Sequence, residues 1–519
     1  MSLVLLAGCT ADADEPARST APATAEVTTP PTALTVLDVD DGGASAIAVS
    51  AALFGSAPVV VVTARSDVAG ASEFGERLGA PVLLAPTVGP PDVLRTELTR
   101  LSPRAVLVVG AGVSAVVEAS ADGVPVFAID AATSELPDGL PDTHPPAPIG
   151  VTVLVDAARD DEAAIATARA AGARVVAVHG TDPRADQAAV HVLRDDPPTT
   201  VLAVGTGFGP VERLRARLEV ASGGVELPGG GQVLFPGRRL VCLYGHPGTP
   251  ALGVLGEQGV EEAVARAKEL AVRYEPLSDV PVVPAFELIA TVAQGSPGPD
   301  GDYSGETSVE ALRPWVEAAG RAGLYVLLDL QPGRARLLDQ ARRYASLLES
   351  PHVGLAVDPE WKLGPDQVPL KQIGGMDAAE INETAHWLAD LTARTALPQK
   401  LFVVHQFRLS MIRDESSLVT DHDDLAVLIH MDGQGTTGQK TATWNNVVAA
   451  RPHDGVPMGW KNFYDEDRPM LTPEQTMSYQ PTPTMISSSE AQPSAVDATS
   501  VGDAFRVGAV ETPAGVGSR

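Results

Sequence analysis

The second half of the chain alternates short apolar runs with amphipathic helical segments, and this rhythm restricts the possible folds more than any other feature. Seven runs are clear: RRLVCLYG, PVVPAFELIATV, YVLLDLQPG, VGLAVDPEW, KLFVVHQF, DLAVLIHMDGQG and VPMGWKNFY. An eighth is expected near TMSYQPTP. A strand that is apolar on both faces lies between two covered layers. Eight such units within about 250 residues fit a (β/α)8 barrel, which we predict over residues 236–486.

Acids and histidines stand at the ends of these apolar runs. The carboxyl ends of barrel strands meet at one rim, where active sites of this architecture are built. The candidate catalytic residues at the predicted rim are Glu287, Asp329, Asp358, Glu360, His405 and Asp432. The candidate substrate-binding residues are Tyr244, His246, Trp361, Gln406, His430, Lys461 and Asp465. We interpret the rim as a functional pocket; the alternative for any one residue is a structural hydrogen bond at a strand end.

Paired carboxylates are the chemistry that this pattern suggests first. Two carboxyl groups on either side of a glycosidic bond act as general acid and as base or nucleophile. Their environments must keep one protonated and the other ionised. The pair we favour is Glu287 with Asp358 or Glu360, with Asp329 tuning one of them, followed by His405 and Asp432.

A metal site is the main chemical alternative. His246, His405 and His430, with Asp358 or Asp432, could ligate zinc that activates a water molecule. However, the first strand carries no His-x-His and the chain contains no His-Glu-x-x-His. No Gly-x-Ser-x-Gly stands between a strand and a helix, so a serine nucleophile has no support either. We therefore expect no metal and no other cofactor.

The first half of the chain, from about residue 35 to 225, also alternates β-rich runs with helical segments. Such alternation predicts a parallel sheet with helices on both faces, as in Rossmann-like layers. A glycine turn follows one run at Gly110 and Gly112, but Ala115 occupies the third glycine position of a dinucleotide fingerprint. We therefore do not expect nucleotide binding. The glycine-rich ASGGVELPGGGQ marks the boundary with the barrel.

Two stretches of this first half resemble a known repeat. AIAVSAALFGSAPVVVVTARSDVAGASEFGERLGAPVLLAP and PRAVLVVGAGVSAVVEAS resemble the type 2 cell-wall-binding repeat of Gram-positive surface proteins, over residues 36–120. The repeat's opening arginine is missing, since LDVDDGG stands in its place, and Val68-Ala69-Gly70 replaces the usual Asp-Ala-Leu. Residues 151–210 show the same alternation of β-rich runs and helical segments, so a second, more degenerate unit is expected. The resemblance implies binding to a wall polymer.

The barrel region resembles a second group. Residues 281–473, through PAFELIATV, YVLLDLQPG, VGLAVDPEW, PQKLFVVHQF and KNFYDED, are similar to uncharacterised actinobacterial secreted lipoproteins with barrels like those of glycoside hydrolases. This resemblance implies a barrel and an extracytoplasmic setting, and it suggests a glycosidase.

The amino-terminal residues suggest a lipid anchor. Leu6-Ala7-Gly8-Cys9 resembles the bacterial lipobox, in which the cysteine is acylated, so residues 1–9 are interpreted as a truncated signal. The apolar stretch is short and no basic residue precedes it, so the true start is expected upstream. Residues 10–34 are rich in Thr, Ala and Pro and predict an unstructured tether. The tail, residues 487–519, is predicted to be unstructured too.

Charge restricts the partners. The 37 basic and 66 acidic residues give a net charge of −29, which argues against nucleic acid and against adsorption to anionic lipid. No run of about 18 or more apolar residues is present, so the membrane is reached only through the lipid anchor. We expect an envelope lipoprotein whose glycoside-hydrolase-like barrel acts on a cell-wall or other polysaccharide, or a non-catalytic surface protein that binds glycans. The sequence does not set the oligomeric state.

Overall fold

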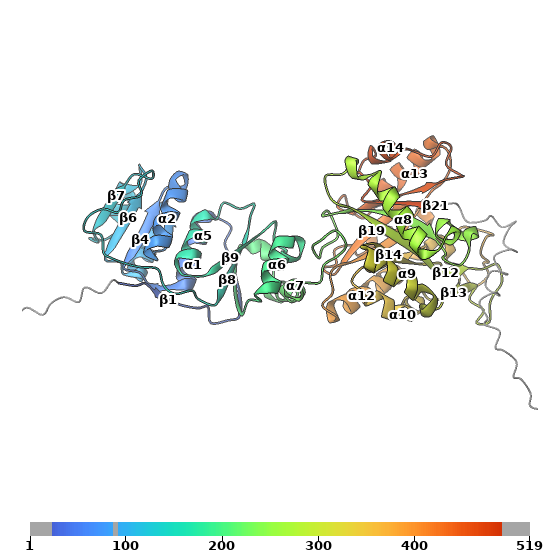
Figure 1. Cartoon of the computed structure of the whole chain (residues 1–519), viewed down its shortest axis with the longest axis horizontal. Helices are drawn as coiled ribbons and strands as arrows, with labels where there is room; N and C mark the ends of the chain where they lie inside the picture. The colour runs from blue at the N-terminus through green and yellow to red at the C-terminus, as the bar shows by residue number, and fades with distance from the viewer. Residues whose placement is uncertain (1–22, 87–91, 490–519) are drawn as a thin grey trace, which may run out of the picture. The chain divides into compact units, whose positions relative to one another are not determined.

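The structure, a computed structural model, describes residues 23–86 and 92–489, and these form two compact units. The first unit contains the described residues up to Thr181 together with Pro198–Val211. The second contains Asp182–Pro197 and the described residues from Glu212 onward. The chain is drawn in Figure 1. Cys9 and residues 490–519 of the predicted tail lie outside the described residues, whereas residues 487–489, predicted to be unstructured, belong to a strand.

The first unit is built from two four-stranded parallel sheets and one two-stranded antiparallel sheet. Its strands are β1 (Glu26–Val27), β2 (Leu34–Leu37), β3 (Phe54–Ser56), β4 (Val59–Thr63), β5 (Val82–Leu84), β6 (Ala105–Val109), β7 (Val126–Ile129), β8 (Val151–Asp156), β9 (Arg174–Val178) and β10 (Thr200–Val204). Its helices are α1 (Gly42–Leu53), α2 (Val68–Leu78), α3 (Asp92–Leu101), α4 (Ser114–Ser120) and α5 (Glu162–Ala170). The sheet orders are β5-β4-β6-β7 and β2-β10-β8-β9.

The two four-stranded sheets have the same strand order in three of their strands and differ in the origin of the fourth. In the orders β5-β4-β6 and β9-β8-β10, the strand that comes first along the chain lies between the other two. The fourth strand is β7 in one sheet, but in the other it is β2, which comes from the start of the unit and pairs Leu34 with Val201. Helix α5 contacts both α1 and α2, and Figure 1 shows these three helices between the two sheets. Buried Thr167 on α5 adds hydrogen bonds to the backbone N–H and carbonyl of Val82. The first half is thus a parallel αβ unit, as the alternation predicts.

Part of the predicted tether is ordered. Glu26 and Val27 pair with Ser56 and Phe54, and Ala25 is buried. The prediction of an unstructured segment is therefore wrong for residues 23–34. The physical reason is not local in sequence: β1 forms a two-stranded antiparallel sheet with β3, and Ala25 and Val27 pack against the core of this unit.

The second unit is a closed barrel of eight parallel strands, so the predicted (β/α)8 architecture is confirmed. The strands are β11 (Arg239–Gly245), β12 (Val282–Ala293), β14 (Tyr325–Leu330), β15 (Val353–Val357), β17 (Lys400–His405), β19 (Leu425–Met431), β20 (Met458–Phe463) and β21 (Met485–Ser489). Pairing of β11 with both β12 and β21 closes the barrel. The short strand β13 (Ser304–Glu306) adds to β12 in antiparallel orientation, and β16 (Met376–Asp377) pairs with β18 (Ile412–Arg413).

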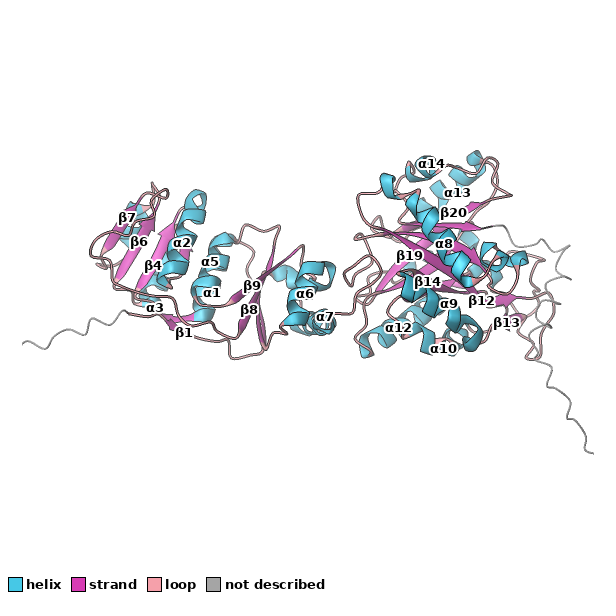
Figure 2. Ribbon diagram, in the orientation of Figure 1, coloured by secondary structure: helices cyan, strands magenta, loops and turns pink. Residues whose placement is uncertain are grey.

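Helices cover the outside of the barrel. They are α8 (Val260–Val272), α9 (Val309–Ala322), α10 (Leu337–Arg343), α11 (Ala345–Leu348), α12 (Ala378–Arg394), α13 (Thr437–Ala450) and α14 (Pro473–Met477), and this unit also holds α6 (Gln187–Asp195) and nearly all of α7 (Val211–Gly223). Figure 2 shows α8, α9, α10, α12, α13 and α14 around the barrel strands. The largest apolar cluster fills the space between strands and helices and includes Leu243, Phe286, Leu328 and Ile486.

The eighth strand lies later than the sequence suggests. TMSYQPTP forms the end of α14 and the connection after it, and the strand is Met485–Ser489. Alternation explains the error, because successive side chains on a strand point to opposite faces. Met485 belongs to the interior cluster, Ile486 packs toward the helices, and Ser487 bonds an interior histidine. A strand with serines at its interior positions gives almost no apolar signal.

Candidate functional site

The barrel interior is apolar toward the amino ends of the strands and polar toward their carboxyl ends. The interior positions nearer the amino ends of the strands are filled by a cluster that includes Cys242, Leu327, Val403 and Leu428, so Cys242 is a buried core residue. Two residues further along most strands, the interior positions become polar. These polar residues are Tyr244, Glu287, Asp329, Asp358, His405, His430 and Lys461, and all are buried. Since each comes from a different strand, the carboxyl ends of seven strands supply one polar layer.

His405 at the end of β17 connects two of the predicted acids. Its Nε2 lies 2.8 Å from Glu287 Oε1 and its Nδ1 lies 3.1 Å from Asp432 Oδ2. Burial disfavours the imidazolium, but the charge of Glu287 and the hydrogen bonds with Asp432 and Glu287 outweigh it and raise the pKa of His405 well above its usual value. His405 is therefore a cation at neutral pH, and both of its N–H groups donate to carboxylates.

Asp432 remains ionised because of this histidine. Burial alone would raise the pKa of Asp432, but the hydrogen bond from His405 and the charge of that imidazolium lower it below its usual value. His430 is affected in the opposite way: burial and the neighbouring charges of His405 and Lys461 lower the pKa of His430 well below its usual value. Neutral His430 shares a hydrogen bond of 3.2 Å with Ser487.

A second group is formed by Tyr244, Asp329 and Lys461. The hydroxyl of Tyr244 donates to Asp329 Oδ2 at 2.9 Å, and the Gln331 amide approaches the same hydroxyl at 3.4 Å. The ammonium of Lys461 lies 3.5 Å from the centre of the Tyr244 ring, a cation–π contact. Burial raises the pKa of Asp329 to about 6, although the charge of His405 opposes the shift. Asp329 is thus poised to change charge near neutral pH.

Three carboxyl groups lie together at the rim. One oxygen from each of Asp358, Glu360 and Asp432 lies within 4.8 Å of the other two. Glu360 belongs to a single 3₁₀ turn, Pro359–Trp361, that directly follows β15 and Asp358. Burial and then the charge of Asp432 raise the pKa of Glu360 to about 8. Burial and then the charge of Glu360 raise the pKa of Asp358 well above its usual value. At neutral pH Glu360 is therefore protonated beside the carboxylate of Asp432, and the equilibrium of Asp358 is shifted toward its protonated form.

Four of the rim acids each have one buried oxygen without a hydrogen-bond partner among the described residues. These oxygens are Glu287 Oε2, Asp329 Oδ1, Asp358 Oδ1 and Asp432 Oδ1. A buried polar atom left in this state costs about 1–3 kcal/mol. Stable cores avoid such groups, whereas sites that bind polar ligands use them. Hydroxyl groups of a ligand would satisfy these oxygens.

The remaining predicted residues take less central places. His246 bonds Thr307 and the backbone N–H of Gly248, and burial lowers its pKa to about 4. Gln406 donates to Glu415 at 2.8 Å, and Trp361 is partly buried with an indole N–H that has no described partner. Asp465 is exposed on the connection after β20. Ser487 is the rim residue that sequence reasoning missed, because its strand was placed elsewhere.

The histidine metal site considered as the alternative does not assemble. Both ring nitrogens of His405 face carboxylates and both of His246 have protein partners, so the three histidines do not direct free nitrogens at one point. At the rim, the group close enough to share a divalent cation is Asp358, Glu360 and Asp432. A second acidic group, Asp300, Asp302 and Glu306, lies near β13 and is partly exposed.

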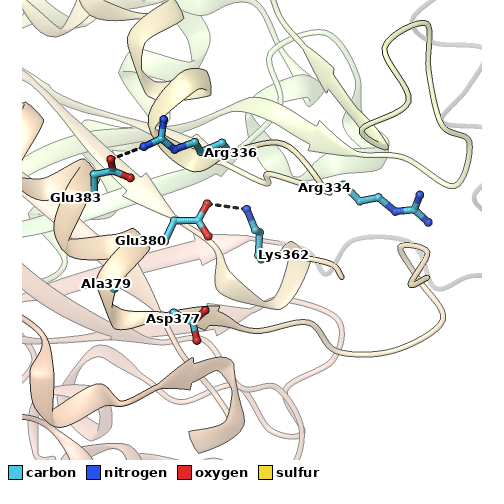
Figure 3. A pocket seen from close by; sticks show the side chains of 7 residues that line it. All are labelled: Arg334, Arg336, Lys362, Asp377, Ala379, Glu380 and Glu383. Carbon is cyan, nitrogen blue, oxygen red and sulfur yellow. Dashed lines mark hydrogen bonds and ion pairs between the residues drawn. The ribbon is translucent and has the colours of Figure 1, made fainter. Parts of the chain in front are cut away.

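A charged cleft borders the loops that follow β14 and β15. It has a volume of about 520 Å³ and is lined by Arg334, Arg336, Lys362, Asp377, Ala379, Glu380 and Glu383. Figure 3 shows its ion pairs, Lys362 with Glu380 at 2.6 Å and Arg336 with Glu383. Arg334 bonds the carbonyl of Gln367 and lies over the Tyr303 ring. Because most of these charges are already paired, the cleft has little net charge for a ligand.

Fold and site define a (β/α)8-barrel protein with a rim rich in carboxylates and histidine. No protein-family model matches the chain, and no curated protein matches it. Among solved structures, Cwp8 from Clostridium difficile is similar over 41% of this chain and 40% of its own length, with 15% sequence identity and a TM-score of 0.19. The matched part is thus about two fifths of that protein. Among the helices of residues 23–86 and 92–489, none has the length and apolar character needed to cross a bilayer.

Proposed function

We propose that the barrel hydrolyses glycosidic bonds of a polysaccharide, with Glu360 as general acid and Asp432 as nucleophile. One observation carries the proposal: two carboxyl groups within 4.8 Å of each other have pKa values shifted in opposite directions. Such a pair contains a proton donor and an ionised partner at the same pH. Sequence reasoning included both residues among its candidates but favoured Glu287 as one member of the pair.

The proposed reaction has two steps. Glu360 donates its proton to the glycosidic oxygen as the bond to the leaving sugar breaks, and Asp432 forms an ester with the anomeric carbon. Glu360, now a carboxylate, takes a proton from water, whose oxygen displaces Asp432 and releases the second sugar. One oxygen of Glu360 lies within 4.8 Å of one oxygen of Asp432, which is compatible with this retaining route, for which the two carboxyl groups lie about 5–5.5 Å apart. His405 acts as a positioning residue that keeps Asp432 ionised.

Location and partners are part of the proposal. The lipobox-like Leu6-Ala7-Gly8-Cys9 supports a lipid anchor at Cys9 and an extracytoplasmic, envelope-associated setting. The resemblance of residues 36–120 to a wall-binding repeat supports a wall polymer as the partner of the first unit. Replacement of Cys9 by Ala should move the protein from the membrane fraction to the medium, and unchanged membrane retention would contradict the anchor.

Hydrolysis of polysaccharides tests the reaction. The chain carrying Cys9→Ala should release reducing sugar from at least one member of a panel of envelope and plant polysaccharides. Glu360→Gln should lower that rate by about 10²–10⁴-fold, and Asp432→Asn should remove it. Asp421→Asn, an exposed acid before β19, is the matched control and should leave the rate unchanged.

Two outcomes would favour other functions. Retention on cell walls without release of sugar from any substrate would favour the non-catalytic, glycan-binding alternative. Hydrolysis that EDTA abolishes and a divalent cation restores would indicate that Asp358, Glu360 and Asp432 hold a metal, and would contradict the proton-donor role of Glu360.

A further inference from the structure

A second cavity lies on the outside of the barrel, in the helix layer. It has a volume of about 460 Å³ and is formed by one face of α13, the end of α14 and the segment that follows it. Thr441 and Asn445 stand one turn apart on α13, and Gln475, Tyr479 and Gln480 face them from the other side. The volume is within the usual range of small-molecule sites, about 300–1,000 Å³.

The lining combines aromatic, hydroxyl and amide groups. Among the described residues, those lining the cavity include no acid, lysine, arginine or histidine. In a chain with 66 acidic and 37 basic residues, this neutral lining selects against charged ligands, whose charge would lose water without gaining a partner.

The cavity is held in place by its aromatic wall. The Tyr479 ring lies 4.5 Å from the Trp460 ring and 5.9 Å from the Trp444 ring, measured between centroids. The indole N–H of Trp444 donates to the carbonyl of Gln480 at 3.0 Å. Because these rings pack against buried residues of the barrel, the wall is preformed and little ordering would accompany binding.

Several polar groups of the cavity are available to a ligand. The hydroxyl of Thr441 donates to the carbonyl of Thr437, so the 2.6 Å contact with Tyr479 is donated by the tyrosine, whose oxygen can still accept. Asn445 is exposed, and its amide has no partner among the described residues. Gln475 uses its oxygen to cap α14 at the Thr472 N–H, which leaves its NH₂ group available.

We infer that this cavity binds a neutral oligosaccharide, as a glycan-binding site separate from the acidic rim. Sugars present apolar C–H faces to aromatic rings and hydroxyl groups to amides, which is the combination that the lining supplies. The site would hold a polysaccharide without cleaving it. The inference does not rest on the proposed hydrolysis, since none of the lining residues belongs to the rim.

Binding of defined oligosaccharides tests this inference. Calorimetric titration of the full chain carrying Cys9→Ala and Glu360→Gln, with cellohexaose, maltohexaose, mannohexaose, xylohexaose and chitohexaose, should detect binding of at least one. Asn445→Trp, which fills the cavity, should weaken that binding by at least about tenfold, equivalent to roughly 1.4 kcal/mol. Asn446→Trp, on the neighbouring exposed position of α13, is the matched control and should retain it.

Equal binding by the two tryptophan variants would overturn the inference, as would the absence of binding by all five hexaoses at millimolar concentration. Circular dichroism of both variants checks that each is folded. Because hydrolysis is measured in a separate assay with the rim variants, failure of the glycosidase proposal and failure of this site give distinct results.

Discussion

Glu360→Gln should stabilise the protein by an amount that grows with pH. The pKa of Glu360 is about 8 in the folded protein and about 4.5 when the side chain is free in water. Between these values the folded state binds a proton that the unfolded state releases, so folding becomes less favourable as pH rises. Glutamine mimics the protonated acid and removes this penalty. One pKa unit corresponds to about 1.4 kcal/mol, so the difference should approach roughly 5 kcal/mol above pH 8.

Urea unfolding at several values between pH 5 and 9 measures this difference directly. The free energies of unfolding of the wild type and Glu360→Gln should be close at pH 5 and separate by about 1.4 kcal/mol per pH unit until pH 8. Asp421→Asn should show no such trend. A separation that stays constant with pH would mean that Glu360 titrates normally, and the proton-donor assignment would then fail.

Further predictions concern the neighbours of this acid and the first unit. Replacing His405 by Phe leaves Glu287 and Asp432 buried without their cation and should lower the free energy of unfolding in urea by about 3–5 kcal/mol. Because the pKa of His405 is raised in the folded protein, this loss of stability should be full below about pH 6.5 and should diminish as pH rises through the folded-state pKa. Tyr244→Phe removes the hydroxyl that donates to Asp329 and should raise the pKa of Asp329 above 6, measured by carbon NMR of the carboxyl group; an unchanged value would contradict the contact. Thr167→Val leaves the Val82 N–H unpaired and should lower the stability of the first unit by about 1–3 kcal/mol, detected by calorimetry.

Much of the barrel could be predicted from local sequence. Seven strands are apolar runs bounded by polar residues, and their periodicity shows in a single sequence. The eighth was misplaced because serines occupy interior positions of its strand. Residues 23–34 were misassigned because pairing of Glu26 and Val27 with a distant segment, Phe54–Ser56, orders part of them. Both errors have one cause: local composition does not report the partner against which a segment packs.

The sequence predicted which residues belong to the candidate site, but not which of them contact one another. Strand-end position was enough to select Glu287, Asp358, His405 and Asp432. The bond between His405 and Glu287 joins residues 118 positions apart, so no spacing rule could reveal it. The opposite pKa shifts of Glu360 and Asp432 depend on burial and on distances between loops, which only the folded structure provides.

Azide rescue tests the central assignment most directly, on a substrate that the wild type cleaves and that carries an activated leaving group. If Asp432 is the nucleophile, Asp432→Ala should be inactive in buffer and should form a glycosyl azide of inverted anomeric configuration when azide is added. Glu360→Ala should form the azide with retained configuration. The same configuration from both variants, or no rescue of either, would contradict the account of this rim as a retaining glycosidase site.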